Sequence, residues 1–344
     1  MKSRRPARIA DIAREAGVGT ATVDRVLNDR DGVSAAMERR VRLAMENVIA
    51  RKPKHVRDRP PPRRLHFEVL LPKDNEAGTS FFARSSQEIG QANQVAVTCS
   101  FVEKMNPAAL ADQLGCIRAR GASGIAFIAL DHPAVSDAVA RILADGIPVV
   151  CISSGLDGSL NVPVVGMDNR AAGRAAGFLM GQIIRRPGRV AVLWGGELYR
   201  SHELREIGFR GVLRAEFPEL GVLDLVSGGD DSDGNYRQVD QMLRDCSDIV
   251  GIYSVGAGNQ GVVDAVKEHG RSQDLIVFGH NLTTTTRRYL MDGSMRAVIH
   301  QDLKRTAQLT ILGLLAQDAG EPLKESRVPV ELIMRENMQG HELS

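Results

Sequence analysis

The chain has 344 residues, and its 44 Lys and Arg nearly balance its 42 Asp and Glu, so the formal net charge is +2. That balance hides a basic first part, because residues 1–64 hold 17 Lys and Arg against 8 Asp and Glu, whereas the remainder holds 27 against 34. The opening run MKSRRPARIADIA lacks the apolar segment of a signal peptide, which argues against a secreted or membrane protein. The uneven charge indicates a basic, nucleic-acid-binding head on an acidic body.

Residues 9–28 predict two short helices joined by a tight turn. Apolar residues recur at helical spacing on one face of each helix: Ile9, Ile12, Ala13 and Ala16 on the first, and Val23, Val26 and Leu27 on the second. Gly17 stands where the first helix must end, in a left-handed conformation that glycine adopts without steric cost. The small side chain of Ala13 suits a close crossing of two helices.

A third helix is predicted after residue 33. Ser34 is a suitable N-cap, and an apolar stripe follows at Met37, Val41, Met45 and Val48. Residues 1–50 are therefore expected to form a small helical domain. An ordinary three-helix bundle would show the same pattern, but the basic charge favours a helix-turn-helix head that reads the major groove of DNA.

This run resembles the head of LacI/GalR-type repressors. The resemblance rests on Ala13, Gly17-Val18, Thr22-Val23, the run RVLN at 25–28, and Val33-Ser34. It implies that Thr20, Ala21 and Arg25 face base edges. It also implies that Thr22 and Asn28 lie near phosphates or brace the turn.

Two residues of the head depart from the family pattern. Gly19 stands where the family usually has a capping serine, a change that costs only a few tenths of a kcal/mol. Asp24 replaces a common serine and puts a negative charge on the DNA-facing helix. Two roles stay open for it: Asp24 accepts a hydrogen bond from a cytosine amino group, or it holds Arg25 in place.

Residues 51–64, RKPKHVRDRPPPRR, are expected to be a linker, because four prolines and a strong basic charge exclude a packed core. The resemblance implies a short hinge helix here with a leucine that enters the minor groove. This linker has no leucine, and its three consecutive prolines favour polyproline II instead. Arg57 and Arg59 either contact phosphates or a narrow minor groove, or belong to a solvated tether.

From residue 65 onward, short apolar runs rich in β-branched residues alternate with helix-length segments. This pattern predicts an α/β fold with parallel sheets covered on both faces. Ten such runs in about 280 residues are too many for one ordinary sheet, so two lobes are expected. The division is placed near Val165 to Arg170, with Asp168 as the cap of a helix.

The core resembles type I periplasmic binding proteins, which share their architecture with LacI-type cores. The resemblance implies that the chain crosses three times between the lobes. The expected bounds are about 65–165 plus 297–330 for the first lobe and about 168–294 for the second. Residues 65–344 are then an effector-binding core.

A ligand site is expected where the carboxyl ends of the parallel strands converge. Hydroxyl, amide, imidazole and carboxylate groups follow several of the predicted strands, together with one indole: Asp74, Asn75, Ser153, Ser154, Trp194, Ser254, His280, Asn281, Gln301 and Asp302. Such groups suit a polyhydroxylated ligand, since each sugar hydroxyl both donates and accepts. Phe81 and Phe82 either stack on a sugar or cyclitol ring or pack in the core, and Trp194 either lines the cleft or simply ends a strand.

The resemblance to ribose-type binding proteins implies roles for two residues, and this chain departs from that subfamily at two places. Arg205 resembles their ligand arginine, and Gln301 resembles a glutamine near their hinge. Ser153 and Ser154 stand where that subfamily often has Asp-Arg, and His280 replaces a usual aspartate. The departures leave the identity of the sugar open.

The run Gly256-Ala-Gly258-Asn-Gln-Gly261 matches the GxGxxG pattern between a predicted strand and a predicted helix. A dinucleotide site also needs a carboxylate at the end of the next strand, but that strand ends in His280-Asn281. No NAD or other cofactor is therefore expected. The glycines are interpreted as allowing close approach of backbone to ligand, with amides available to a phosphate.

No catalytic or metal-binding constellation is predicted. The eight histidines lack metal-ligand spacing, and Cys99, Cys116, Cys151 and Cys246 are interpreted as buried free thiols in a reducing compartment. The sequence predicts a cytoplasmic, nucleoid-associated repressor that acts as a homodimer on operator DNA, under the control of a sugar, sugar alcohol, cyclitol or sugar phosphate. The alternatives are a solute-binding transport component, and a phosphosugar-binding protein or enzyme with a fused DNA-binding head.

Overall fold

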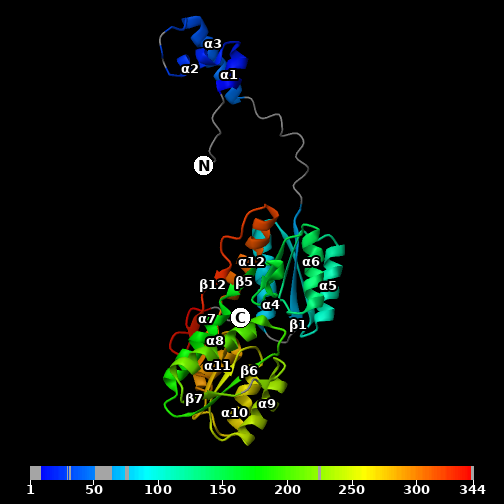
Figure 1. Ribbon diagram of the computed structural model, residues 1–344, viewed down its shortest axis with the longest axis vertical. Helices are drawn as coiled ribbons and strands as arrows, with labels where there is room; N and C mark the ends of the chain where they lie inside the picture. The colour runs from blue at the N-terminus through cyan, green and yellow to red at the C-terminus, as the bar shows by residue number, and fades with distance from the viewer. Residues whose placement is uncertain are drawn as a thin grey trace. The chain divides into compact units, whose positions relative to one another are not determined.

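The computed structural model describes residues 9–28, 30, 32–50, 64–73, 77–223 and 226–341. The chain divides into two units, a head of residues 1–63 and a core of residues 64–344 (Figure 1). The expected linker at 51–64 lies outside the described residues except for Arg64, so the predictions for Arg57 and Arg59 do too. None of the described helices is long and apolar enough to cross a membrane.

The head consists of three helices: α1 (Ile9–Ala16), α2 (Thr20–Leu27) and α3 (Ala35–Ala50). Its hydrophobic core is formed by residues of all three helices: Ile12, Ala13, Ala16, Val23, Val26, Val41 and Ala44. Gly17 has a φ of +63°, as a left-handed helix end requires, and Arg40 donates to the carbonyl of Ala16 at 2.7 Å. The third helix buries Val41 and Ala44, whereas Met37 of the expected stripe is exposed.

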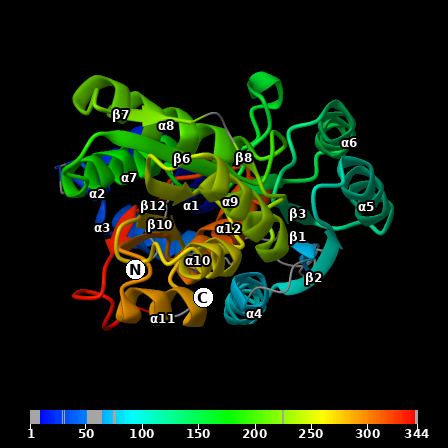
Figure 2. The ribbon, with the colours of Figure 1, turned by 90° about the horizontal axis from the view of Figure 1, so that it is seen from below.

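The first sheet of the core is parallel, in the order β12-β5-β4-β3-β1-β2. Its strands are β1 (His66–Lys73), β2 (Ala96–Glu103), β3 (Gly124–Phe127), β4 (Val149–Ile152), β5 (Val164–Met167) and β12 (Arg327–Val328). Helices α5 (Pro107–Ala119) and α6 (Pro133–Ala144) pack side by side, as do α4 (Ala77–Ala92) and α12 (Leu303–Asp318) (Figure 2). A short 3₁₀ helix, η2 (Gly158–Leu160), follows β4.

The second sheet has the order β13-β11-β10-β9-β6-β7, with β8 also paired to β6. Its strands are β6 (Gly188–Trp194), β7 (Leu220–Val222), β8 (Val226–Ser227), β9 (Ile249–Ser254), β10 (Ile276–His280), β11 (Ala297–His300) and the antiparallel β13 (Glu331–Ile333). Its helices are α7 (Asn169–Ile183), α8 (Arg200–Glu216), α9 (Ser232–Asp245), α10 (Asn259–Glu268) and α11 (Thr284–Asp292). The α/β fold with two lobes, predicted from the sequence, is confirmed.

The chain passes between the two sheets at three places. The first passage follows β5, and there the carboxylate of Asp168 accepts from the amide of Ala171 at 3.0 Å and caps α7. The second lies at Gln301–Asp302, and the third lies between β12 and β13. The expected return to the first lobe at about Ala297 needs correction, because β11 pairs with β10 in the second sheet.

The structure also divides and adds strands relative to the sequence pattern. Residues 220–226 (LGVLDLV), one of the ten apolar runs predicted as strands, form two short strands, β7 and β8, separated by residues 223–225. Strands β12 and β13 were not expected, because runs of two and three residues are too short to show a period.

Candidate functional site

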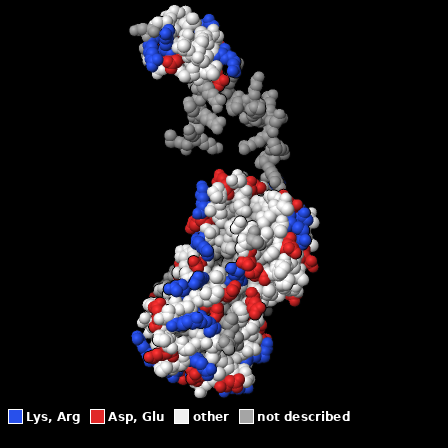
Figure 3. Space-filling view, viewed as in Figure 1, with Lys and Arg blue, Asp and Glu red and all other residues white. Residues whose placement is uncertain are grey.

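The exposed side of α2 is the candidate DNA-reading surface of the head. Thr20, Ala21, Arg25 and Asn28 are exposed there, and Thr22 is half-buried. Val23 and Val26 of the same helix are buried in the head core and hold this face outward. Several basic patches lie on the face of the head seen in Figure 3. The helix thus presents one donor-rich surface to solvent.

The structure pairs Asp24 with Arg30. One carboxylate oxygen of Asp24 accepts from the side-chain amide of Asn28 at 3.0 Å, and the other lies 3.2 Å from Nη1 of Arg30. One of the two roles left open for Asp24, that of holding Arg25 in place, is therefore not what the structure shows. Asp24 instead fixes Arg30, and the side chain of Arg25 makes no hydrogen bond to any described residue.

A cavity lies between the two lobes of the core, with an empty volume of about 900 Å³ that includes its open mouth. Seven residues that the sequence assigned to effector binding line it: Phe82, Ser153, Ser154, Arg205, His280, Asn281 and Gln301. They come from both lobes and from the second passage between them.

Several of the expected effector residues are not among the lining residues. Asn75 lies outside the described residues. Phe81 lines a second hollow, because adjacent positions on a helix point in different directions. Trp194 is half-buried and packs against the hydrophobic core, and Ser254 is 1% exposed within β9. Trp194 and Ser254 thus have a structural place in the second lobe.

Arg205 is held inside the cavity by neutral partners. Its Nε donates to Oδ1 of Asn169 at 2.9 Å, and its Nη1 donates to the carbonyl of Val255 at 2.5 Å. No carboxylate among the described residues forms an ion pair with it. Burial lowers the pKa of this guanidinium, and nearby Tyr253 and Asp230 oppose that effect. Arg205 thus brings an unpaired positive charge to the cavity.

Two glycines set the depth at which Arg205 lies. A Cβ at Gly173 of α7 would collide with the carbonyl oxygen of Arg205, and one at Gly208 of α8 would collide with that of Arg170. The two helices therefore cross in backbone contact, and α8 carries Arg205 into the cavity wall. The sequence shows these glycines but not which helix they face.

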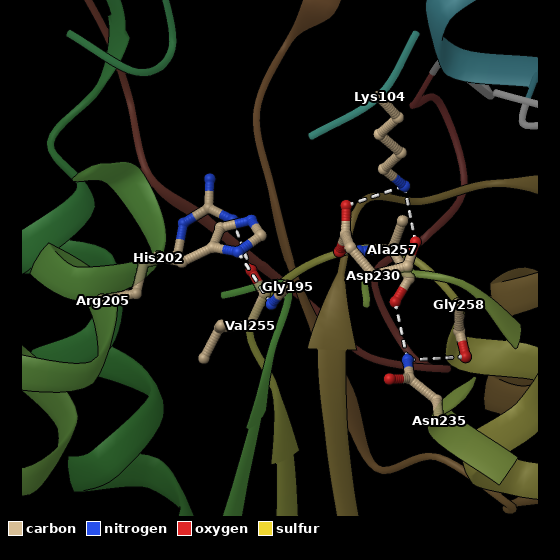
Figure 4. Close-up of polar contacts among 9 residues, drawn as sticks. All are labelled: Lys104, Gly195, His202, Arg205, Asp230, Asn235, Val255, Ala257 and Gly258. Atoms are coloured by element: carbon tan, nitrogen blue, oxygen red, sulfur yellow. Dashed lines mark hydrogen bonds and ion pairs between the residues drawn. The ribbon is translucent and has the colours of Figure 1, made fainter. Parts of the chain in front are cut away.

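His202 is a cavity residue that the sequence did not indicate. Its Nδ1 accepts from the amide of Gly195 at 3.1 Å, as Figure 4 shows. Burial lowers the pKa of His202 to about 4, with the charge of Asp230 opposing and that of Arg205 adding to the effect. The imidazole is therefore neutral near pH 7, and because Nδ1 accepts, Nε2 carries the proton.

Lys104 and Asp230 also line the cavity without having been expected there. Nζ of Lys104 in the first lobe lies 2.9 Å from Oδ2 of Asp230 in the second, and it also donates to the Asp230 carbonyl at 2.5 Å. The other carboxylate oxygen accepts from the amide of Ala257 at 2.5 Å (Figure 4). Each oxygen of the Asp230 carboxylate thus already has a partner in the protein.

The glycines of the GxGxxG run, at residues 256–261, leave room for the Asp230 carboxylate and for neighbouring backbone. A Cβ at Gly256 would collide with the Asp230 carboxylate, and Gly258 has a φ of +76° at the start of α10. Gly261 lies against the carbonyl of Ser232 in α9. Gly256 and Ala257 line the cavity, as expected of glycines that let backbone approach a ligand. The amide of Ala257, however, already donates to Asp230 and is not free for a phosphate, and the glycines also allow close approach of the chain's own segments.

Three buried polar atoms of the cavity have no hydrogen-bond partner among the described residues. They are Nδ1 of His280, Oδ1 of Asn281 and Oε1 of Gln301. The other ring nitrogen of His280 lies 2.8 Å from the hydroxyl of Tyr253, and burial holds the pKa of His280 well below its ordinary value. Since unpaired buried polar groups are costly, these atoms indicate a place for a polar ligand.

The second hollow contains His300, Glu331 and His341, whose ligand atoms lie within 4.8 Å of one another. His300 and Glu331 are cross-strand neighbours on β11 and β13. Nδ1 of His300 accepts from the amide of Leu282 at 3.1 Å, so its Nε2 keeps a proton. With one nitrogen engaged and the other protonated, His300 is a poor metal ligand in this orientation.

The cysteines are free thiols, but they are not all buried. Cys151 is fully buried, and burial raises its pKa to about 12. Cys116, expected to be buried, is exposed on α5 because it lies opposite the buried residues Leu114 and Ile117.

The chain matches two families. Residues 68–321 match the family described as periplasmic binding protein domain, and residues 8–48 match bacterial regulatory proteins, lacI family. Among curated proteins, it is 27% identical over 228 residues to a D-ribose/D-allose-binding protein of Pseudomonas aeruginosa, covering 62% of this chain and 70% of that protein. It is 30% identical over 170 residues to the HTH-type transcriptional regulator MalR of Streptomyces coelicolor, covering 48% and 47%.

Solved structures share the fold of the core. A glucose-galactose binding protein of Geobacillus stearothermophilus superposes with a TM-score of 0.75 at 19% identity, over 80% of this chain and 99% of that one. A solute-binding protein of Actinobacillus succinogenes with bound D-allose superposes with a TM-score of 0.74 at 20% identity, over 80% and 100%. At these identities the likeness concerns the fold alone.

Proposed function

This chain belongs to the periplasmic binding protein domain family and carries a DNA-binding head of the bacterial lacI family, and from that premise we propose that it is a homodimeric repressor controlled by a sugar-like effector. The observation that carries the proposal is the presence, on one chain, of an exposed α2 surface and a polar cavity between two lobes. Neither a solute carrier nor a simple DNA-binding protein needs both.

The head supplies the DNA-reading part of the proposal. Thr20, Ala21 and Arg25 are assigned to base edges in the major groove, and Thr22 and Asn28 to the backbone. Asp24 acts through Arg30. Its carboxylate lies 3.2 Å from Nη1 of Arg30 and holds that side chain beside the same surface. Two heads in a dimer read the two halves of a pseudo-palindromic operator. The proposed place of action is the cytoplasm, on the nucleoid.

The cavity supplies the control. Its lining residues belong to both lobes, so a ligand that bridges Ser153 and Ser154 on one side to Arg205 and His202 on the other favours the closed arrangement. Closure changes how a dimer holds its two heads. The coupling free energy between effector and operator is expected to be about 1–3 kcal/mol, and it must be reciprocal.

The experiment starts from DNA that the full chain selects out of a random library. Anisotropy titrations of that DNA, with and without sugars, sugar alcohols, cyclitols and sugar phosphates, measure the coupling. We expect sequence-selective binding that at least one compound shifts about tenfold. A chain that selects no sequence would refute the proposal.

Matched variants separate the two parts. Arg205→Met is expected to remove the ligand response and to keep the operator affinity of the ligand-free protein. Arg174→Met, which removes an exposed arginine of α7 outside the cavity, is the control and keeps both properties. No catalytic step is proposed, and turnover of any phosphosugar by the full chain would favour an enzyme instead.

A further inference from the structure

We propose that the effector of this regulator carries an anionic group, a carboxylate or a phosphate, that pairs with Arg205. The inference rests on the proposed function, because it assumes that the cavity between the lobes is the effector site. It narrows the ligand from any polyhydroxylated compound to a sugar acid or a sugar phosphate.

The first argument is the charge of the cavity wall. Among the described lining residues the charged side chains are Lys104, Arg205 and Asp230, two cations and one anion. Lys104 and Asp230 pair with each other at 2.9 Å, which leaves the charge of Arg205 without a partner in contact. The wall therefore carries a net charge of +1 near neutral pH, provided that its histidines are neutral.

Both histidines of the wall are neutral on geometric grounds as well as by burial. His202 accepts a backbone hydrogen bond through Nδ1, which a doubly protonated ring cannot do. His280 is 1% exposed, pairs with the Tyr253 hydroxyl and faces no carboxylate in hydrogen-bond contact among the described residues. Neither ring adds a charge, so the positive charge of Arg205 stands uncompensated.

The second argument is the cost of that charge. Arg205 is only 6% exposed, and its two hydrogen-bonded nitrogens bind a neutral amide and a carbonyl. Its Nη2 has no hydrogen-bond partner among the described residues. A buried cation is stable when an anion and good hydrogen bonds accompany it, and a planar guanidinium suits a carboxylate or phosphate in particular. The missing anion is therefore expected on the ligand.

The third argument is the absence of a free carboxylate for sugar hydroxyls. Asp230 is the one acidic residue among the described lining residues, and its charge is paired with Lys104 while its other oxygen accepts from the amide of Ala257. The unpartnered groups Nδ1 of His280, Oδ1 of Asn281 and Oε1 of Gln301 are neutral. They can bind hydroxyls, while Arg205 binds the anion.

The test measures binding to the full chain by calorimetry with matched pairs of probes. D-glucose is compared with D-glucuronate and D-glucose 6-phosphate, and D-ribose with D-ribonate and D-ribose 5-phosphate, with inorganic phosphate as a separate probe. We expect an anionic member to bind at least about tenfold more tightly than its neutral counterpart. The carboxylate and phosphate arms distinguish the two sources of charge.

An isosteric variant places the missing anion on the protein. Asn281→Asp adds a carboxylate to the wall and is expected to weaken the anionic probe at least about tenfold while the neutral probe gains affinity. Asn281 has a φ of +64°, which Asp tolerates as Asn does, and Gln301→Glu provides the same charge at a second place. Asn161→Asp, at φ +49° and exposed, is the matched control and keeps the preference.

Asp74 follows β1 but lies outside the described residues, so its carboxylate is removed in a further variant, Asp74→Asn, for which the preference for the anion is expected to persist. Loss of that preference, or neutral probes that bind as tightly as anionic ones, would overturn the inference.

Binding of neutral sugars that release operator DNA leaves the proposed regulator intact and refutes only the anionic group of the effector. Anions that bind without any effect on DNA support the inference and count against the proposed regulation. Absence of binding in every pair overturns the inference.

Discussion

Lys104 and Asp230 join the two lobes directly across the cavity, with Nζ 2.9 Å from Oδ2. Lys104 follows β2 in the first lobe, and Asp230 precedes α9 in the second. Arg200 of the second lobe makes a similar bridge, 3.5 Å from Asp131 and 3.3 Å from Asp157 of the first. Charge pairs thus join the two lobes.

Breaking the Lys104–Asp230 pair is expected to loosen the lobes. Lys104→Met leaves the mostly buried Asp230 carboxylate without its cation, and we expect a loss of about 2 kcal/mol in unfolding free energy. Asp230→Asn should cost a similar amount, and the double variant less than the sum. Chemical denaturation measures all three.

The control for this cycle is Arg118→Met, which breaks an exposed pair with Asp145 on the outside of the first lobe. It should lower the free energy of unfolding much less than Lys104→Met does, because exposed ion pairs contribute little to stability. Strict additivity of the two single variants would show that Lys104 and Asp230 do not act together.

Gly17→Ala is expected to destabilise the head by about 1–2 kcal/mol, because φ +63° strains a residue with a Cβ. The added Cβ would also lie 2.9 Å from Nη2 of Arg40, whose hydrogen bond closes the end of α1. Hydrogen exchange of head peptides in the full chain measures the effect. Gly19→Ser, at the N-cap of α2 with open space around it, should instead slow exchange slightly.

Arg25→Ala is expected to cost about 1–3 kcal/mol of specific DNA binding and to relax the sequence preference at one position. Arg25 is exposed on α2, so the head should fold without it. Anisotropy titrations with DNA selected by the full chain provide the measurement. Arg14→Ala, on α1 with 82% of its side chain exposed, is the control; an equal loss in both variants would contradict the role of Arg25 in reading bases.

Stability is expected to fall in mild acid because of His202. Burial lowers the pKa of this residue to about 4 from an ordinary 6.5, so the unfolded chain takes up the proton more readily. The contribution of His202 to the free energy of unfolding is complete above pH 6.5 and is lost as the pH falls towards 4. The loss amounts to about 2 kcal/mol between pH 7 and pH 5. Melting temperatures across this range measure it.

His202→Gln should reduce this acid dependence without abolishing it, because burial lowers the pKa of His300 to about 4 as well. His132→Asn, which replaces one exposed cap of α6 by another, is the comparison. An unchanged acid slope in His202→Gln would contradict the neutral assignment of its ring.

Local features of this chain could be predicted from sequence. Gly17 ends α1 in the left-handed region and Asp168 caps α7, because both effects depend on a few neighbouring residues. Ser153 follows β4 of the first sheet and Gln301 follows β11 of the second, so their hydrogen bond joins strand ends of both sheets, as expected for a ligand site where carboxyl ends of strands converge. Repeating patterns therefore predicted the fold and seven of the 21 residues that line the cavity.

The remaining wall depends on contacts between distant segments. Lys104 and Asp230 are 126 residues apart, and nothing in the spacing of either predicts their ion pair. His202 belongs to a helix whose rotation is set by glycine contacts with α7, so its direction was not visible in sequence. For the same reason the spacing of the histidines in the sequence does not reveal that His300 lies beside His341. The two come together only when β13 pairs with β11.

The three passages between the sheets have a kinetic consequence. Gln301 lies within one passage and donates to the hydroxyl of Ser153 at 3.3 Å, so the lobes stay tied at this edge whatever their angle. Lys104 and Asp230 lie away from the passages, on loops joined by their ion pair and by the hydrogen bond from Lys104 to the Asp230 carbonyl. Effector capture should then proceed in two steps, a concentration-dependent docking at the tied edge followed by a first-order closing step whose rate saturates at high effector concentration.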